Sequence, residues 1–119
     1  MRLNVQIFGT RKSSDTRKAQ RFFAERRIPV HFVDVADKPP SRRELLRFIQ
    51  KFGTEALLDR ESRRFQDLGL ASAHRGDERW LETMMEEPLV LRLPLVREGN
   101  RLSVGHEPQA WKAWVQSPS

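Results

Sequence analysis

The chain has 119 residues, of which 38% are hydrophobic, and it carries a formal net charge of +6. This length predicts one domain with a sizeable core, which we place over residues 1–119. Because the sequence contains no cysteine, it excludes disulfides, thiolate chemistry and Cys-ligated zinc or iron–sulfur sites.

Apolar runs reach only about five residues, far below the roughly 20 needed to span a bilayer. The first residues lack the apolar stretch of a signal peptide, so we expect a cytoplasmic protein with no membrane partner. The three histidines are scattered, so neither a metal site nor a cofactor is expected. Basic residues are interleaved with acidic ones, which favours a mixed-charge surface over nucleic-acid binding.

The first third of the chain predicts a strand, a helix and a second strand. Apolar residues alternate over residues 1–8, which is typical of a strand. A helix is predicted over residues 15–27, with an apolar face formed by Ala19, Phe22 and Phe23. The nearly continuous apolar run over residues 30–35 is typical of a central strand. Together these elements predict a right-handed parallel βαβ unit.

The middle of the chain predicts a helical insertion over about residues 41–87. Ser41, with Glu44 three residues later, predicts a capping box at the start of a helix that ends at Gly53. Further helical turns are predicted over residues 54–58 and near residues 65–69. A last helix of the insertion is predicted over residues 77–87, stopped by Pro88.

The last third predicts strands over residues 89–93, 94–97 and 101–104, with a Gly-Asn hairpin turn before the last of these. Pro108 then predicts the first turn of a final helix. The order of elements is βαβ, helices, then ββα. This order predicts an α/β protein with a thioredoxin-like fold, in which a small mixed sheet has flanking helices and a helical insertion.

The loop from Gly9 to Lys18 is the candidate functional segment. It joins a strand to a helix N-terminus, where free amide groups and the helix dipole favour anions. All four residues from Ser13 to Thr16 are N-cap types, so the helix begins among them, and Asp15 is a candidate cap. An ordinary capped turn is the alternative interpretation.

Segments in three parts of the chain, the N-terminal, middle and C-terminal parts, carry a resemblance to a known family. The run from Thr16 to Ala19 is similar to an Arg-Lys-Ala segment at the start of a first helix, and residues 65–70 stand where a Tyr-Arg-Glu-Leu-Gly-Leu motif is typical. Residues 88–96 resemble two hydrophobic strands joined by Arg-Arg-Pro, and residues 101–105 follow as after the hairpin. The order and spacing of these segments resemble the arsenate reductase (ArsC) and Spx family over essentially the whole chain.

The resemblance implies that the catalytic cysteine of the family is replaced here by Ser13. It also implies that the second cysteine of Spx-type members is replaced by Thr16. A serine hydroxyl stays protonated at neutral pH and needs a positioned base to act as a nucleophile. No histidine or carboxylate stands in an evident pairing position. Thiol-based arsenate reduction, disulfide exchange and redox sensing at this loop are therefore excluded.

The resemblance also implies three arginines that hold an oxyanion, and these match only in part. Arg60 matches the first, whereas Leu93 occupies the second position, with Arg92 one residue earlier, and the third has no clear match. A cis peptide bond is implied between Leu93 and Pro94. A weaker site for phosphate, sulfate or a carboxylate would draw on the following residues, whose alternative role is simply as surface or capping residues: Arg11, Lys12, Ser13, Ser14, Arg17, Arg60, Arg92 and Pro94.

We therefore favour a protein-binding or regulatory module without redox activity. Spx-type members act by contacting RNA polymerase, and a basic protein suits an acidic partner surface of that kind. Two alternatives are binding of an oxyanion or glutathione-type ligand, and a divergent arsenate reductase-like oxidoreductase. Enzymatic activity is the less favoured interpretation because residue 13 carries no thiol.

Overall fold

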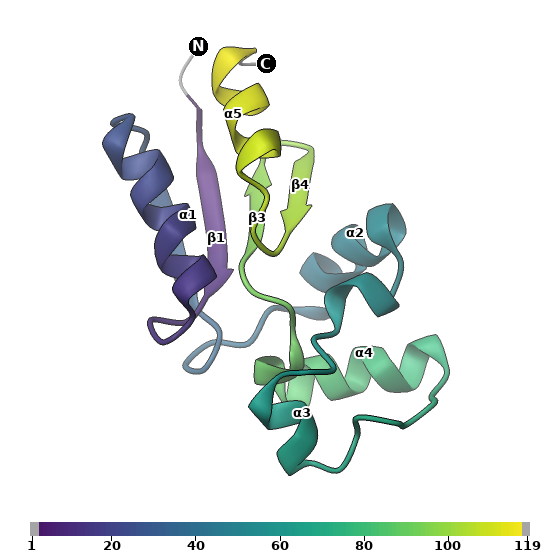
Figure 1. The fold of residues 1–119 in the computed structure, drawn as a ribbon. Coiled ribbons are helices and arrows are strands. Elements are labelled where there is room, and N and C mark those ends of the chain that lie inside the picture. Colours follow the sequence, from purple (N-terminus) through teal and green to yellow (C-terminus); the bar gives the residue numbers. More distant parts are fainter. Residues whose placement is uncertain (1–2, 118–119) are drawn as a thin grey trace. The chain divides into compact units, whose positions relative to one another are not determined.

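The computed structural model describes residues 3–117, and Figure 1 shows the arrangement of their helices and strands. The elements in chain order are β1 (Val5–Gly9), α1 (Ser14–Glu25), β2 (Val30–Asp34), α2 (Arg42–Phe52), the 3-10 helix η1 (Glu55–Leu57), α3 (Arg63–Asp67), α4 (Asp77–Glu86), the 3-10 helix η2 (Pro88–Val90), β3 (Leu95–Glu98), β4 (Arg101–Val104) and α5 (Pro108–Gln116). This order confirms the predicted sequence of a βαβ unit, a helical segment and a ββα unit.

The described residues form two compact units. The first comprises residues 3–34 and 93–117, and the second is the continuous segment Val35–Arg92. The first unit contains the whole sheet with α1 and α5, whereas the second contains α2, α3, α4 and both 3-10 helices. The segment predicted as an insertion, residues 41–87, lies inside the second unit.

The sheet of the first unit has four strands in the order β2-β1-β3-β4. Strand β1 runs parallel to β2 and antiparallel to β3, and β3 pairs with β4 across the predicted turn. Gly99 has a φ of 61°, as the first central residue of a type II′ turn requires. The prediction that β2 is central was wrong, since β3 occupies the other side of β1 and leaves β2 at an edge.

One face of this sheet is covered by α1 and α5. Its buried core joins Val5 and Ile7 of β1 with Val96 of β3, and the helices contribute Ala19, Phe23, Trp111 and Trp114. The indole Nε1 of Trp111 donates a hydrogen bond of 2.9 Å to Ser103 Oγ, so this large buried side chain has its one polar atom satisfied. The apolar run of β2 is explained by this face, because Val30 and Phe32 pack against the same core.

A charged pair fixes the end of α5 to the hairpin. Arg101 donates two hydrogen bonds to Glu98 Oε1, at 2.9 and 2.6 Å, and Glu98 is only 6% exposed. The same guanidinium donates to the carbonyl oxygen of Ser117 at 2.8 Å. A cation at this place satisfies a carbonyl at the helix end and complements its partial negative charge.

The second unit has its own core and confirms the predicted helix cap. Ser41 Oγ accepts from Glu44 N at 3.1 Å, and Glu44 Oε1 accepts from Ser41 N at 2.8 Å, which completes the capping box. The buried side chains come from every element of the unit: Leu45, Phe48, Leu57, Leu58, Phe65, Trp80, Leu81, Met84, Val90 and Leu91.

The predicted strand over residues 89–93 was wrong. Residues Pro88–Val90 form a 3-10 helix, and of the predicted segment only Leu91 makes a β-bridge, with Leu58. Pro88 sets a helical φ at the first position of this turn, and Val90 N donates to the carbonyl oxygen of Glu87 at 3.0 Å. Leu89 is left 42% exposed, whereas a buried strand would cover it.

Candidate functional site

The candidate loop connects β1 to α1 within the first unit. Ser13 N donates to the side-chain Oγ1 of Thr10 at 3.2 Å and to its carbonyl oxygen at 3.3 Å. Ser13 Oγ in turn accepts from Thr16 N at 3.1 Å, which makes Ser13 the N-cap of α1. The loop is therefore a turn held by its own hydrogen bonds, and Ser13, rather than the predicted Asp15, caps the helix.

The hydroxyl of Ser13 has a structural role and lacks a base. Asp15 forms an ion pair with Lys18 at 3.7 Å. Among residues 3–117, no histidine or carboxylate forms a hydrogen bond with Ser13 Oγ. A serine without such a base remains a neutral hydroxyl and a weak nucleophile. The geometry therefore provides a helix cap at the position where the resemblance places a nucleophile.

Thr16 lies beneath the loop with an unsatisfied hydroxyl. Its side chain is fully buried, and in the described part of the chain Thr16 Oγ1 has no hydrogen-bond partner. It packs directly against Gly9, where an added Cβ would lie 2.4 Å from both Oγ1 and Cγ2 of Thr16. Gly9 is thus required by the close approach of the helix, and the Thr16 hydroxyl carries the cost of a buried polar group without a partner.

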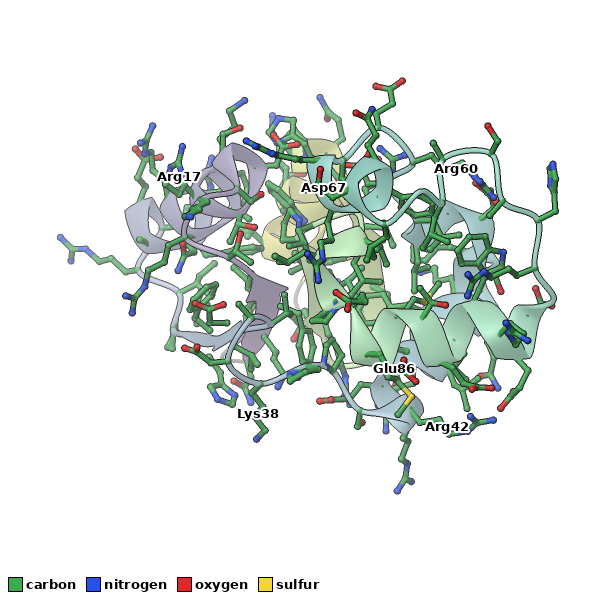
Figure 2. All side chains as sticks on the ribbon, turned by 90° about the horizontal axis from the view of Figure 1, so that it is seen from below. Arg17, Lys38, Arg42, Arg60, Asp67 and Glu86 are labelled. Carbon is green, nitrogen blue, oxygen red and sulfur yellow. The ribbon has the colours of Figure 1, made fainter. Side chains whose placement is uncertain are left out.

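Exposed basic side chains surround the start of α1. Arg11, Lys12 and Arg17 are all exposed, as is Ser14. Arg17 Nη1 donates a hydrogen bond of 2.6 Å to the carbonyl oxygen of Arg11, which holds its guanidinium against the loop. Figure 2 shows Arg17 among the charged side chains that project from this part of the ribbon. The structure thus brings these four predicted residues together with Ser13.

Arg60 belongs to the second unit, where its guanidinium is already occupied. Arg60 Nε and Nη2 donate to the two carboxylate oxygens of Glu55 at 2.6 and 3.0 Å, and Nη1 donates to the carbonyl oxygens of Ala71 and Ala73 at 3.1 and 3.0 Å. The hydrogen bonds from Arg60 to the Glu55 carboxylate lower the pKa of Glu55 below its ordinary value. Binding of an anion by Arg60 would require some of these hydrogen bonds to break, and its role as a ligand stays a prediction.

Arg92 and Pro94 stand on either side of the boundary between the units. Arg92 Nη2 donates a long hydrogen bond of 3.4 Å to the carbonyl oxygen of Leu58, and the residue is otherwise exposed. The peptide bond between Leu93 and Pro94 is cis, which confirms the expectation drawn from the resemblance. The predicted anion ligands are thus divided between the two units: Arg60 and Arg92 belong to the second, and the others belong to the first.

The positive charge of the chain is concentrated in the first unit. Residues 1–34 and 93–119 contain 11 basic and five acidic residues, whereas residues 35–92 contain 11 of each, which accounts for the totals of 22 and 16. The net charge of +6 therefore belongs to the first unit alone. Most of it comes from residues 11–27, the loop and α1, with seven basic residues against two acidic ones.

Two classes of site are absent from the described residues. Within residues 3–117, no group of three or more histidine, aspartate or glutamate side chains is arranged to hold a metal ion. No helix in that range has the length and apolar character required to cross a membrane.

A sequence comparison assigns the chain to a protein family. The ArsC family pattern matches residues 8–114, which is most of the chain. The chain belongs to the ArsC family. Among ArsC-like relatives, it is 24% identical over 118 residues to "Uncharacterized protein YusI" of Bacillus subtilis, covering 95% of this chain and 100% of that one.

Other ArsC-like relatives carry names of two kinds. The chain is 27% identical over 106 residues to "Global transcriptional regulator Spx 2" of Oceanobacillus iheyensis, covering 87% of this chain and 78% of that protein. The solved structure of an arsenate reductase from Vibrio cholerae matches with a TM-score of 0.80 and 22% identity, over 94% of this chain and 98% of that one. This likeness establishes the thioredoxin-like fold of the family, and this member of it contains no cysteine.

Sequence reasoning missed two features of this ArsC-family chain. The first is the buried Glu98–Arg101 pair that anchors α5; a carboxylate and a guanidinium three residues apart across a hairpin turn are a detectable signal. The second is a polar face of the sheet around Gln6, opposite the α1 and α5 side. Its signal is the alternation of Asn4 and Gln6 with apolar neighbours over residues 3–7, which indicates that this end of one sheet face lacks an apolar cover, whereas Phe8 on the same face is buried.

Proposed function

We propose that this chain is a protein-binding, regulatory member of the ArsC family that performs no thiol chemistry. The observation that carries the proposal is the state of the loop: Ser13 Oγ is used as a helix cap, and Thr16 occupies the second cysteine position with a buried hydroxyl. A family member that cannot form a thiolate must act by something other than thiol chemistry. Its positive charge favours binding of another protein.

The charge distribution favours an acidic partner. All seven basic side chains of residues 11–27 are exposed, and we call these residues the basic segment: Arg11, Lys12, Arg17, Lys18, Arg21, Arg26 and Arg27. Complementary charge speeds association and excludes partners of like charge, although salt screens exposed charges beyond about 10 Å at 0.1 M. An acidic surface of a protein such as RNA polymerase would meet this requirement, and the name of the Spx-type relatives is compatible with such a role.

Charge reversal tests this proposal. Arg17 and Arg21 lie one helical turn apart on α1, so Arg17→Glu/Arg21→Glu inverts the centre of the basic segment. The matched control, Arg43→Glu/Lys51→Glu, makes the same change in charge at exposed positions of α2 in the second unit. Affinity capture from the native cell is expected to recover one acidic protein with the wild type and the control, and to lose it with the α1 variant. Recovery of no protein above background would reject the proposal.

A second assay addresses catalysis directly. We expect purified protein to reduce no arsenate in the presence of glutathione and glutaredoxin, because neither residue 13 nor residue 16 carries sulfur. Turnover that disappears in Ser13→Ala would overturn this expectation, since it would show that the serine hydroxyl reacts.

A second candidate function is the binding of a small oxyanion at the loop. It is favoured by the hydrogen bond from Arg17 to the Arg11 carbonyl oxygen, which holds a guanidinium beside the start of α1. Amides at the first helical positions have no acceptor within the helix and favour anions. Titration with phosphate, arsenate or glutathione should then shift the amide NMR signals of residues 9–18. Signals that stay still at millimolar concentrations would exclude this function.

A further inference from the structure

The face of the sheet opposite α1 and α5 carries a row of polar side chains in direct register. Gln6 on β1 lies opposite His31 on the parallel neighbour β2 and opposite Arg97 on the antiparallel neighbour β3. Side chains directly opposite one another in a sheet lie roughly 5 Å apart and point to the same face. Their sequence neighbours Val5, Ile7 and Val96 belong to the core on the other face, so the row faces away from α1 and α5.

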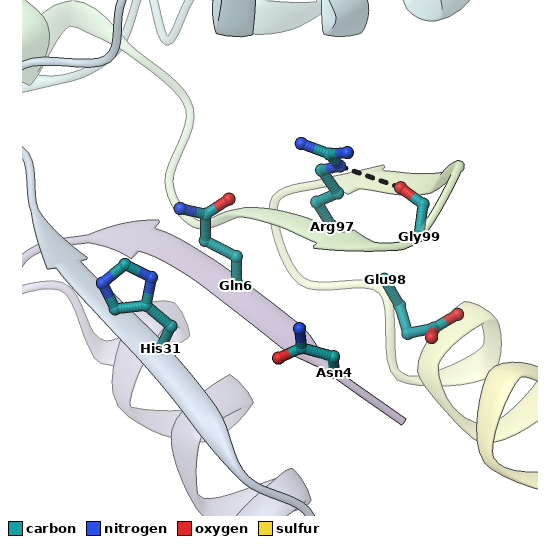
Figure 3. A pocket seen from close by; sticks show the side chains of 6 residues that line it. All are labelled: Asn4, Gln6, His31, Arg97, Glu98 and Gly99. Atoms are coloured by element: carbon teal, nitrogen blue, oxygen red, sulfur yellow. Dashed lines mark hydrogen bonds between the residues drawn. The ribbon is translucent and has the colours of Figure 1, made fainter. Parts of the chain in front are cut away.

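These side chains line an open cavity of about 310 Å³, together with Asn4, Glu98 and Gly99. Figure 3 shows Asn4, Gln6, His31 and Arg97 on one side of the sheet, while the Glu98 side chain turns toward α5. The cavity lies wholly within the first unit, at the end of β1 remote from the Gly9–Lys18 loop.

The polar groups of the row are open to a ligand. Arg97 Nε donates to the carbonyl oxygen of Gly99 at 2.8 Å, which orients the guanidinium, and no carboxylate of residues 3–117 forms an ion pair with Arg97. The one acidic residue of the lining, Glu98, is paired with Arg101 instead. In the same described range, the side chains of Asn4, Gln6 and His31 form no hydrogen bond with the protein.

We propose that this cavity binds a small molecule that carries one carboxylate beside an amide group, such as an N-acylated amino acid. The guanidinium of Arg97 supplies one positive charge and a planar pair of donors that matches a carboxylate. The side-chain amide of Gln6 can both donate to and accept from a ligand amide, and the imidazole of His31 can do the same. One fixed charge suits a monoanion better than phosphate, whose charge at neutral pH is larger.

The proposal does not depend on the proposed function. It concerns the other face of the sheet from α1, and none of its residues belongs to the basic segment. Loss of the protein partner in the charge-reversal experiment would therefore leave this cavity unaffected, and loss of ligand binding here would leave the partner unaffected.

The test is an amide NMR titration of the full chain with three probes: N-acetylglycine, its neutral amide N-acetylglycinamide, and inorganic phosphate. We expect N-acetylglycine to cause saturable shifts at Gln6, His31 and Arg97 in the millimolar range usual for so small a ligand. We expect the neutral amide to cause none, and phosphate to bind these residues less tightly than N-acetylglycine. Shifts of equal size with the neutral amide, tighter binding of phosphate, or no shifts at all would each overturn the proposal.

Two variants test the assignment of this site. Arg97→Gln removes the charge and is expected to weaken N-acetylglycine binding about tenfold, as the loss of a charged hydrogen bond does. Gln6→Glu keeps Arg97 and places a competing carboxylate directly opposite it, so it is expected to abolish binding in a folded protein. The matched control Arg43→Gln removes an exposed charge from α2 and should leave binding unchanged. Unchanged affinity in Arg97→Gln or Gln6→Glu would overturn the assignment.

Discussion

The buried hydroxyl of Thr16 predicts that removing it will stabilise the protein. Thr16→Val replaces the hydroxyl with a methyl group of similar size, and both residues have similar helix propensities. A buried hydroxyl without a hydrogen bond costs about 1–3 kcal/mol, and Thr16 Oγ1 has no partner in the described residues. We therefore expect the free energy of unfolding to rise by about 1–2 kcal/mol.

The assay is reversible unfolding in urea, followed by circular dichroism, with thermal unfolding as a second measurement. An unfolding entropy of about 2.1 cal/mol/K per residue gives about 0.25 kcal/mol/K for this chain. The expected stabilisation therefore corresponds to an increase in Tm of about 4–8 °C. Both measurements use the full chain, and neither depends on any ligand.

A second buried threonine supplies the matched control. Thr83 on α4 is 8% exposed, and its Oγ1 donates to the carbonyl oxygen of Arg79 at 2.9 Å and accepts from Arg75 Nη1 at 3.1 Å. The same change, Thr83→Val, should lower the free energy of unfolding by about 1 kcal/mol, because it breaks these hydrogen bonds. A loss of stability in Thr16→Val similar to that in Thr83→Val would refute the reasoning, since it would mean that Thr16 Oγ1 has a partner.

Three further predictions concern other contacts. Ser13→Ala should lower the free energy of unfolding by about 1 kcal/mol through loss of the N-cap, as urea unfolding will reveal; no loss would show that the cap is dispensable. Ser103→Ala should cost about 1–3 kcal/mol in the same assay because it leaves the buried Trp111 Nε1 without an acceptor; a neutral result would indicate another acceptor. The pKa of Glu55 is lowered by its hydrogen bonds to Arg60, so this pair stabilises the folded state above pH 4.5, and the contribution is lost as the pH falls through the lower folded value. Because the Glu55 side chain is 66% exposed, Glu55→Gln should cause only a small loss of stability at pH 7, and a difference from the wild type that persists in acid would contradict this origin.

Local signals in the sequence predicted local structure well. The capping box at Ser41 and Glu44 was found because both partners lie within one helical turn. The Gly-Asn turn was found because it limits the backbone conformations of two adjacent residues. The cis bond before Pro94 came from the resemblance to the family, which the comparisons confirm.

Features that depend on distant residues were not accessible in the same way. The apolar run of β2 reflects its burial against α1 and the core. Such a run does not determine the order of the strands in the sheet. Arg60 matched a family ligand in sequence, yet its guanidinium is bound to carbonyl groups of Ala71 and Ala73, which no spacing rule could connect to it. The row through Gln6 became visible only when the register of three strands was known.

The interleaved order of the two units has a consequence for synthesis on the ribosome. Strand β1 is one of the two inner strands of the sheet, but β3, its partner on one side, begins only at Leu95. A nascent chain that ends before this residue can complete Val35–Arg92 as a continuous segment, whereas β1 has only β2 beside it. The unpaired N–H and C=O groups at an exposed strand edge can form hydrogen bonds with strands of other chains. Strand β3 therefore covers one edge of β1, and chains that end before Leu95 are expected to aggregate through β1.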